Sequence, residues 1–409
     1  MKLITLEEAL QRLEGVKVPL RIEDVSILKS IGRFLAEDVV SDIELPPFDK
    51  SSRDGYAVRA KDTFTASESN PVKLRLKGYV KIGEIPRFRI LDNECAYIPT
   101  GAPLPEGSDA VVMVENTYRE GGTVYIYKAV PPSENVVRRG SDIPKHLLVL
   151  RRGTRIGVGE IALLAAIGRG NVKVYERPKA MIISTGPELV EVGKSLVEGK
   201  IYDINNYMIY SYLIGQLGLE PEILGILDDA VETLKKAVIE SLKNSDLIFI
   251  SGGTSKGEGD LLHNTLIEIL KERMGKILFH GISLKPGKPT IIAVIEGKPV
   301  IGLPGNPTSA FTVLEVLIKP WILKCIFGAE QRELTINAVL TRKLLNLEGR
   351  REIVYVKLIN VGDKVLAQPI LKGSEATTTF VEADGYIEIP EDVNFVEEGS
   401  TVKVKLIDV

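Results

Sequence analysis

Apolar runs and amphipathic stretches alternate regularly between residues 178 and 328. Short apolar runs, typical of buried strands, occur at 180–183, 223–227, 247–250 and 299–303. Stretches with apolar residues at helical spacing lie between or after them, at 207–217, 230–242, 261–273 and from Ser309 onward. Strands that alternate with amphipathic helices indicate a parallel sheet covered on both faces. The pattern therefore predicts a central αβα domain.

The flanking segments have different patterns. Residues 3–14 predict an amphipathic helix with Thr5 and Glu8 spaced as a capping box, and a short helix running into a strand is expected at 31–40. From Pro46 to about Asp142, short alternating runs separated by Gly and Pro predict an all-β insert. Residues 143–175 return to a mixed pattern, and the last stretch, about 330–409, contains only short alternating strands.

A chain of 409 residues exceeds the size of one hydrophobic core. We expect an α/β multidomain protein with four parts. The predicted parts are a discontinuous N-terminal α/β domain (1–45 and 143–176), a β-rich insert (46–142), the αβα parallel-sheet domain (177–328) and a C-terminal β domain of barrel type (329–409).

Composition and charge exclude several functions. A net charge of −3 gives no overall attraction to nucleic acid or to an anionic membrane. Cys95 and Cys325 fit no CxxC spacing and the three histidines are scattered, which disfavours zinc and iron–sulfur sites. The N-terminus is acidic where a signal peptide needs apolar residues, and the apolar stretch 310–327 is interrupted by charges and a proline. We expect a cytoplasmic protein.

The segment 251–260, Ser-Gly-Gly-Thr-Ser-Lys-Gly-Glu-Gly-Asp, joins an apolar strand to a helical pattern. Glycines let the backbone approach a phosphate closely, and a helix N-terminus with free N–H groups favours an anion. Asp260 could hold the cation that accompanies a phosphate. A tight turn without function is the alternative.

Polar residues follow the other predicted strands as well, and the strand ends of an open parallel sheet converge on a ligand site. No GxGxxG opens a βαβ unit, and Pro289 stands where a Walker A loop needs Ser or Thr. Lys285 and Lys288 lie in a loop stiffened by two prolines and could meet an anion, or the loop could be a solvated hairpin tip.

Several acidic residues have structural alternatives. Asp228 could cap the helix that begins near Ala230, and capping is favoured for Asp203 and Asn205. Asp54 could belong to an Asp-Gly turn between strands, and residues 138–142 could form an exposed charged turn.

The ordered set of segments resembles the molybdopterin molybdenumtransferase (molybdenum insertase) family, which includes the C-terminal domain of gephyrin. The matching segments run in order along the whole chain and lie at 46–57, 100–103, 109–112, 138–142, 184–189, 251–260, 285–289 and 303–307.

The resemblance implies a homodimer whose αβα domain is of the molybdopterin-binding type. It also implies a reaction in which adenylylated molybdopterin and molybdate react with Mg²⁺ present, the phosphoanhydride is broken and AMP is released. The oxyanion could equally be tungstate, since both are tetrahedral dianions. The molybdopterin adenylyltransferase is a partner that the resemblance suggests.

Site residues are carried over position by position. Family functional positions fall on Asp54, Thr100, Asp142, Glu188, Asp228, Asp260 and Lys285. Glu188, Asp228 and Asp260 are candidates for Mg²⁺, and Lys285 and Lys288 for neutralising anionic charge. Pterin-nucleotide contacts are expected from Ser251, Gly252, Gly253, Thr254, Gly305, Asn306 and Ser309. Arg350 or Arg351, with Ser374, could reach the oxyanion from the C-terminal domain. Relatives carry a second basic residue where this chain has Gly281, and His280 is a candidate to replace its charge.

Two other functional classes remain open. A nucleotidyl transferase that adenylylates the pterin would need little more than the αβα domain. A non-catalytic scaffold would not require carboxylates at three strand ends. The insert with Asp54 and Asp142 argues against the first class, and the strand-end carboxylates argue against the second.

Overall fold

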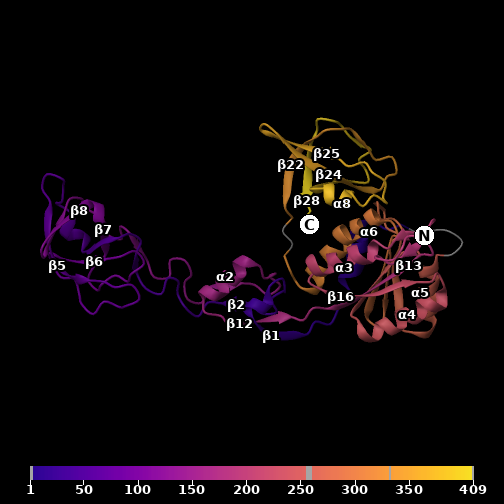
Figure 1. Cartoon of the computed structure of the whole chain (residues 1–409), viewed down its shortest axis with the longest axis horizontal. Helices are drawn as coiled ribbons and strands as arrows, with labels where there is room; N and C mark the ends of the chain where they lie inside the picture. The colour runs from indigo at the N-terminus through magenta and orange to yellow at the C-terminus, as the bar shows by residue number, and fades with distance from the viewer. Residues whose placement is uncertain (1–2, 255–259, 331–332, 408–409) are drawn as a thin grey trace. The chain divides into compact units, whose positions relative to one another are not determined.

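The computed structural model describes residues 3–254, 260–330 and 333–407. The chain divides into two compact units, shown with their elements in Figure 1. The first unit contains residues 1–37, 152–157 and 171–409, and the second contains 38–151 and 158–170. The predicted boundaries at 45, 142, 176 and 328 are finer than this division and stay a prediction.

A six-stranded mixed sheet forms the centre of the first unit. Its order is β16 (Glu220–Leu227), β13 (Lys179–Thr185), β17 (Leu247–Ser251), β21 (Lys298–Leu303), β20 (Ile291–Ile295) and β18 (Gly275–His280). The first four strands are parallel, which confirms the αβα prediction.

Strands β20 and β18 are antiparallel to their neighbours, and the sequence pattern did not indicate them. Glu296 and Gly297, with φ of +51° and +81°, join β20 to β21 as a two-residue hairpin. Two positive φ angles in such a loop define a type I′ turn, but Glu-Gly is a weaker signal for it than Asn-Gly.

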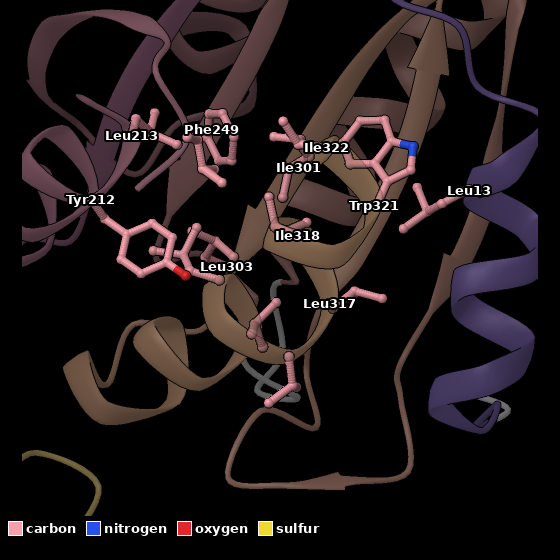
Figure 2. Close-up of a cluster of buried hydrophobic side chains, with 14 of the residues drawn as sticks. Leu13, Tyr212, Leu213, Phe249, Ile301, Leu303, Leu317, Ile318, Trp321 and Ile322 are labelled. Carbon is pink, nitrogen blue, oxygen red and sulfur yellow. The ribbon is translucent and has the colours of Figure 1, made fainter. Parts of the chain in front are cut away.

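Helices cover both faces of this sheet. On one face lie α4 (Val231–Asn244) and α5 (Leu261–Glu272), whose apolar residues pack against the alternate residues Ile248 and Ile250 of β17. On the other lie α3 (Asn205–Gly215) and α6 (Pro307–Val313), which continues through η4 (Leu314–Ile318), α7 (Lys319–Trp321) and η5 (Ile322–Ile326). Figure 2 shows this second core, in which Trp321 lies beside Leu13 of α1 (Leu6–Glu14).

The N-terminal helix forms as the sequence predicts. Oγ1 of Thr5 accepts from the Glu8 amide at 3.1 Å, and Oε2 of Glu8 accepts from the Thr5 amide at 3.2 Å, which completes the capping box. Of the short helix running into a strand expected at 31–40, the helix is wrong, whereas a strand is present at its end as β2 (Val39–Val40). Gly32 has a φ of +76°, and the amides of Gly32 and Leu35 donate to the carbonyls of Ile156 and Thr154, so this segment pairs as extended chain.

The C-terminal domain is a closed five-stranded barrel. Its strands run in the order β24 (Arg351–Val361), β25 (Lys364–Pro369), β22 (Thr335–Leu340), β28 (Thr401–Leu406) and β26 (Gly385–Ile389), and β26 pairs with β24 again. The short pair β23 (Leu344–Leu345) and β27 (Phe395–Val396) and helix α8 (Thr379–Glu382) complete it.

A short strand from the αβα domain joins this barrel. Strand β19 (Leu284–Lys285), in the loop between β18 and β20, pairs in parallel with Arg351 and Glu352 of β24. The loop that carries Lys285 and Lys288 is therefore not the solvated hairpin tip considered as an alternative. The first unit also contains β1 (Ile22–Ser26) paired with β12 (Asn171–Tyr175), and β14 (Leu189–Val190) paired with β15 (Ile201–Tyr202).

The second unit contains the predicted β insert. Its sheet runs in the order β7 (Ala110–Met113), β4 (Gly55–Val58), β6 (Glu94–Ile98), β5 (Val72–Tyr79), β9 (Thr123–Ile126) and β8 (Thr117–Glu120). The second unit also contains the pairs β3 (Lys50–Ser51) with β10 (Val136–Val137) and β2 (Val39–Val40) with β11 (Leu148–Leu150), and helix α2 (Val158–Ala166). The fold class expected from the sequence is confirmed.

Candidate functional site

A cavity of about 850 Å³ lies where β13, β17 and β21 of the first unit end. We call it the strand-end cavity. Its walls come from the segments that follow these strands, from the start of α3, from the loop before β20 and from Glu375 of the C-terminal domain. The residues predicted to bind substrate that line it are Glu188, Ser251, Gly252, Gly253, Thr254, Lys288, Gly305, Asn306 and Ser309.

The glycine turn after β17 packs against the end of β13. Gly252 has a φ of +92°, and a Cβ placed there would lie 2.2 Å from the carbonyl oxygen of Thr185. Gly253 has a φ of +66°, and its Cβ would lie 3.1 Å from Oγ1 of Thr185. Both positions therefore require glycine for backbone conformation and for close approach. Residues 255–259 of the predicted loop lie outside the described residues.

Asn205 joins two walls of the cavity. Its Nδ2 donates to Oγ of Ser251 at 2.6 Å and to the carbonyl of Gly305 at 2.7 Å, which connects the ends of β17 and β21. Its buried Oδ1 has no hydrogen-bond partner. Sequence reasoning assigned Asn205 to capping and missed this role, because nothing in the local pattern indicates which distant strand ends an amide will reach.

Carboxyl groups dominate the charge of the cavity. Glu188, Asp203, Asp229 and Glu375 line it, and Lys288 is the one cation among its described lining residues. Burial raises the pKa of Asp203, which is only 2% exposed. Burial also raises the pKa of Asp229, and the negative charge of Glu188 adds to the rise. The cavity thus concentrates negative charge that a cation would relieve.

The carboxylate after β16 that lines the cavity is Asp229, whereas the sequence pointed to Asp228. Asp228 lies beside it and contributes like charge that further raises the pKa of Asp229. The capping alternative for Asp228 is wrong, because α4 begins at Val231 after Ala230 and no side chain caps it. Asp203 does act as expected, since its Oδ1 accepts from the amide of Asn206 at 3.1 Å.

Asp260 lies at the N-terminus of α5 and is not among the lining residues of the cavity. Its Oδ1 accepts from the amide of His263 at 3.1 Å, and its Oδ2 lies 2.9 Å from Nε2 of His280. The imidazole rings of His263 and His280 stack with centroids 4.9 Å apart. One amide that was expected to be free for an anion is therefore already bonded to the Asp260 carboxylate.

Two residues predicted to contact the oxyanion, Lys285 and Arg351, lie where β19 pairs with β24 of the barrel. Nζ of Lys285 lies 3.0 Å from Glu352 and 3.8 Å from Glu348. Arg351 pairs with Glu388 at 3.2 Å, with Glu391 at 3.4 Å and with Glu7. These two cations thus contact carboxylates of the protein itself.

Ser374 connects the C-terminal domain to the rim of the cavity. Its Oγ accepts from Nδ2 of Asn306 at 2.6 Å, and its carbonyl accepts from the amide of Thr308 at 3.0 Å. The structure therefore brings together Asn306 and Ser374, which the sequence placed in different domains.

Asp54, Thr100 and Asp142 belong to the second unit. Oδ1 of Asp54 accepts from the amide of Thr100 at 2.6 Å and from its Oγ1 at 2.8 Å, and these bonds lower the pKa of the exposed Asp54 carboxyl. Strands β3 and β4, which flank Asp54, pair with β10 and with β6 and β7, so Asp54 is not in a hairpin turn between them. Asp142 is exposed, and its amide donates to Leu45 at 3.0 Å.

Among residues 3–254, 260–330 and 333–407, no three His, Cys, Asp or Glu side chains gather closely enough to hold a metal ion by themselves. In the same part of the chain, no helix has the length and apolar character needed to cross a membrane.

Three family models match successive regions of this chain, and together they indicate one class of protein. Residues 4–168 match the "MoeA N-terminal region (domain I and II)", 181–324 match a "Probable molybdopterin binding domain", and 337–407 match the "MoeA C-terminal region (domain IV)". The order of these regions, with the molybdopterin-binding model over the cavity-bearing sheet, defines a MoeA-type multidomain protein.

Full-length relatives give the family. The molybdopterin molybdenumtransferase of Bacillus subtilis is 33% identical, and the alignment covers 99% of this chain and 94% of the relative. That of Haemophilus influenzae is 34% identical, with 98% of each chain covered. This chain therefore belongs to the molybdopterin molybdenumtransferase family of enzymes.

Solved structures agree with this assignment. A crystal structure of the molybdopterin biosynthesis protein MoeA from Pyrococcus horikoshii is 43% identical, with a TM-score of 0.80 and 99% of each chain covered. A second MoeA structure from the same organism is 31% identical, with a TM-score of 0.85 over 99% of this chain and 100% of the other.

Proposed function

We propose that this enzyme inserts molybdate, or tungstate, into adenylylated molybdopterin, breaking the phosphoanhydride and releasing AMP to give molybdenum cofactor. The observation that carries the proposal is the strand-end cavity. Its volume of about 850 Å³ is within the roughly 300–1,000 Å³ of small-molecule sites. The names of the full-length relatives supply the reaction class.

The donor set of the cavity fits Mg²⁺. Mg²⁺ is usually bound by one or two carboxylates together with substrate phosphates and water. Glu188 and Asp229 are such a pair, and the raised pKa of Asp229 reflects charge crowding that a cation would relieve. Mg²⁺ would neutralise phosphate charge in a cavity whose own side chains are mostly acidic. Asp228, beside Asp229, would strengthen the attraction for the cation.

Residues of the chain itself would hold the nucleotide. The glycine turn offers backbone amides without side chains in the way, together with Ser251 and Thr254. The unpartnered Oδ1 of Asn205 is an acceptor placed at a cavity wall. Lys288 would supply positive charge to the phosphate, and Gly305, Asn306 and Ser309 also line the cavity.

Other predicted residues would complete the site around this cavity. Lys285 and Arg351 would contact the oxyanion from the place where β19 pairs with β24, Ser374 would contact it from the rim of the cavity, and Asp260 would support the metal. Asp54, Thr100 and Asp142, which belong to the second unit, would take part in the same reaction. The enzyme would be a cytoplasmic homodimer that receives the pterin nucleotide from the adenylyltransferase.

The test is anaerobic AMP release from adenylylated molybdopterin with Mg²⁺, with and without molybdate or tungstate. We expect oxyanion-dependent release by the wild type and a loss of about 100-fold or more in Glu188→Ala, which removes a cavity carboxylate. Glu191→Ala is the matched control, because Glu191 is an exposed neighbour that pairs with Lys194 at 2.7 Å and does not line the cavity.

Two results would contradict the proposal. The absence of AMP release with either oxyanion, from folded protein, would exclude the insertase reaction. ATP-dependent adenylylation of the pterin in its place would identify an adenylyltransferase, and a folded protein with neither activity would favour a scaffold.

A further inference from the structure

His280 and Asp260 form a contact that is built into the sheet. His280 ends β18 and Asp260 caps α5, and Nε2 of His280 lies 2.9 Å from Oδ2 of Asp260. The two side chains are only 18% and 17% exposed. The contact is therefore largely shielded from water, where an interaction between polar groups is stronger than at the surface.

The His280 ring is fixed from two sides. Its backbone is paired with Ile291 in the sheet, and the next residue, Gly281, donates its amide to Thr290 at 2.8 Å. The His263 ring stacks on the His280 ring at an interplanar angle of 22°. A rigid strand and a stacked ring thus set the position of Nε2.

The Asp260 carboxylate is held by one contact on each oxygen. His263 donates its backbone amide to Oδ1, and His280 faces Oδ2. The first turn of α5 is also hydrogen-bonded to the glycine turn, because the amide of Leu262 donates to the carbonyl of Gly253 at 3.1 Å.

We infer that His280 is a positioning residue that fixes the Asp260 carboxylate next to the glycine turn. This rests on the proposed function, in which Asp260 supports the metal at the cavity. His280 would act through Asp260 and not as the anion-binding replacement considered for the basic residue missing at Gly281. Groups that orient a metal-binding carboxylate typically change metal affinity or activity by about 10- to 100-fold when removed.

Three variants separate the nitrogen contact from ring packing. His280→Leu removes the nitrogen, and His280→Gln keeps a nitrogen donor without the ring. His263→Phe is the matched control, because it keeps both the stacked ring and the backbone amide that Asp260 accepts from. Each is measured by hydrogen exchange of the first turn of α5 and by kcat and KM for AMP release at several Mg²⁺ concentrations.

We expect His280→Leu to speed exchange at the first turn of α5, to lower kcat about 10- to 100-fold and to raise the Mg²⁺ requirement. KM for the pterin nucleotide should change little, and His280→Gln and His263→Phe should stay close to wild type. Unchanged exchange and kcat in His280→Leu would overturn the inference. Equal losses in His280→Leu and His280→Gln would also overturn it, because ring packing would then explain the effect.

The positioning role of His280 and the proposed function can be tested independently of each other. If wild-type protein releases no AMP, the proposed function is wrong, and the exchange measurement still decides whether His280 holds Asp260. If the wild type is active and hydrogen exchange in the first turn of α5 is the same in His280→Leu, only the positioning role is wrong.

Discussion

The strand-end cavity and the Asp54–Thr100 contact shift the pKa of their carboxyl groups in opposite directions. In the cavity, burial raises the pKa of Asp203 and of Asp229. On the second unit, the amide and hydroxyl of Thr100 lower the pKa of Asp54, which is fully exposed. The same residue type is thus destabilised as an anion in one region and stabilised in the other.

The difference indicates different tasks. Asp203 is buried, and the exposed Asp229 is crowded by the charges of Glu188 and Asp228, so a cation at the cavity would offset the cost of ionising both groups. An exposed carboxylate fixed by two donors stays ionised and keeps its orientation, so Asp54 is suited to act on a substrate group presented to it.

The largest expected effect is on activity. If both regions serve one reaction, Asp54→Ala should lower AMP release by roughly 10²- to 10³-fold, as removal of a charge-stabilising group does. The unit should stay folded, because Asp54 is exposed. Glu68→Ala, another exposed carboxylate of the same unit, is the control. Full activity in Asp54→Ala would confine the site to the αβα domain.

A smaller effect is expected on stability at the cavity wall. Gly252→Ala should destabilise the first unit by about 3 kcal/mol, because the new Cβ meets a backbone oxygen and the residue keeps a positive φ. At Gly305, by contrast, a Cβ would meet only the Cα of Gly252, at 3.8 Å. Gly305→Ala should therefore unfold near the wild-type temperature in calorimetry. Equal melting of both variants would show that the turn tolerates side chains.

The smallest effect is a pair of opposite pH dependences. A raised folded pKa means that Asp203 adds stability below its unfolded pKa, near 3.8, and that this stability is lost as the pH rises through the folded value. Asp203→Asn should therefore melt higher than wild type at pH 7, with the difference vanishing below pH 3.8.

Asp54 should behave in the opposite way. Its lowered pKa means that its stabilisation is present above 3.8 and lost as the pH falls through the folded value. Asp54→Asn should melt below wild type at pH 7. Shifts of the same sign in Asp203→Asn and Asp54→Asn would refute the contrast between the two regions.

Periodicity predicted most of the fold because it is a local property. The capping box at Thr5 and the apolar strand 247–250 are readable within a few residues. The segment 31–40 was misjudged because its partners, Thr154 and Ile156, lie more than a hundred residues away. Strand β20 was missed because its hairpin with β21 depends on a Glu-Gly turn with no strong signal.

The site was predictable in its residue types and less so in its contacts. The positions after predicted strands located Glu188 and the glycine turn, and the proline-stiffened loop located Lys288; all of these line the cavity. It could not choose Asp229 over Asp228, since adjacent residues at a strand end face different surroundings. Nor could it foresee that Asn205 links β17 to β21, or that Lys285 contacts Glu352.

The pairing of β19 with β24 limits how the chain can be divided. A cut near residue 328 would follow the predicted domain boundary. It would separate β19, with Leu284 and Lys285, from β24 and expose the edge of β24. The cut would also break the hydrogen bond between Thr312 and Tyr355. It would expose Phe311 to solvent, since Phe311 packs on Tyr355 and Phe380. A fragment ending there should aggregate, so truncated variants and fusion proteins need the αβα sheet and the barrel together.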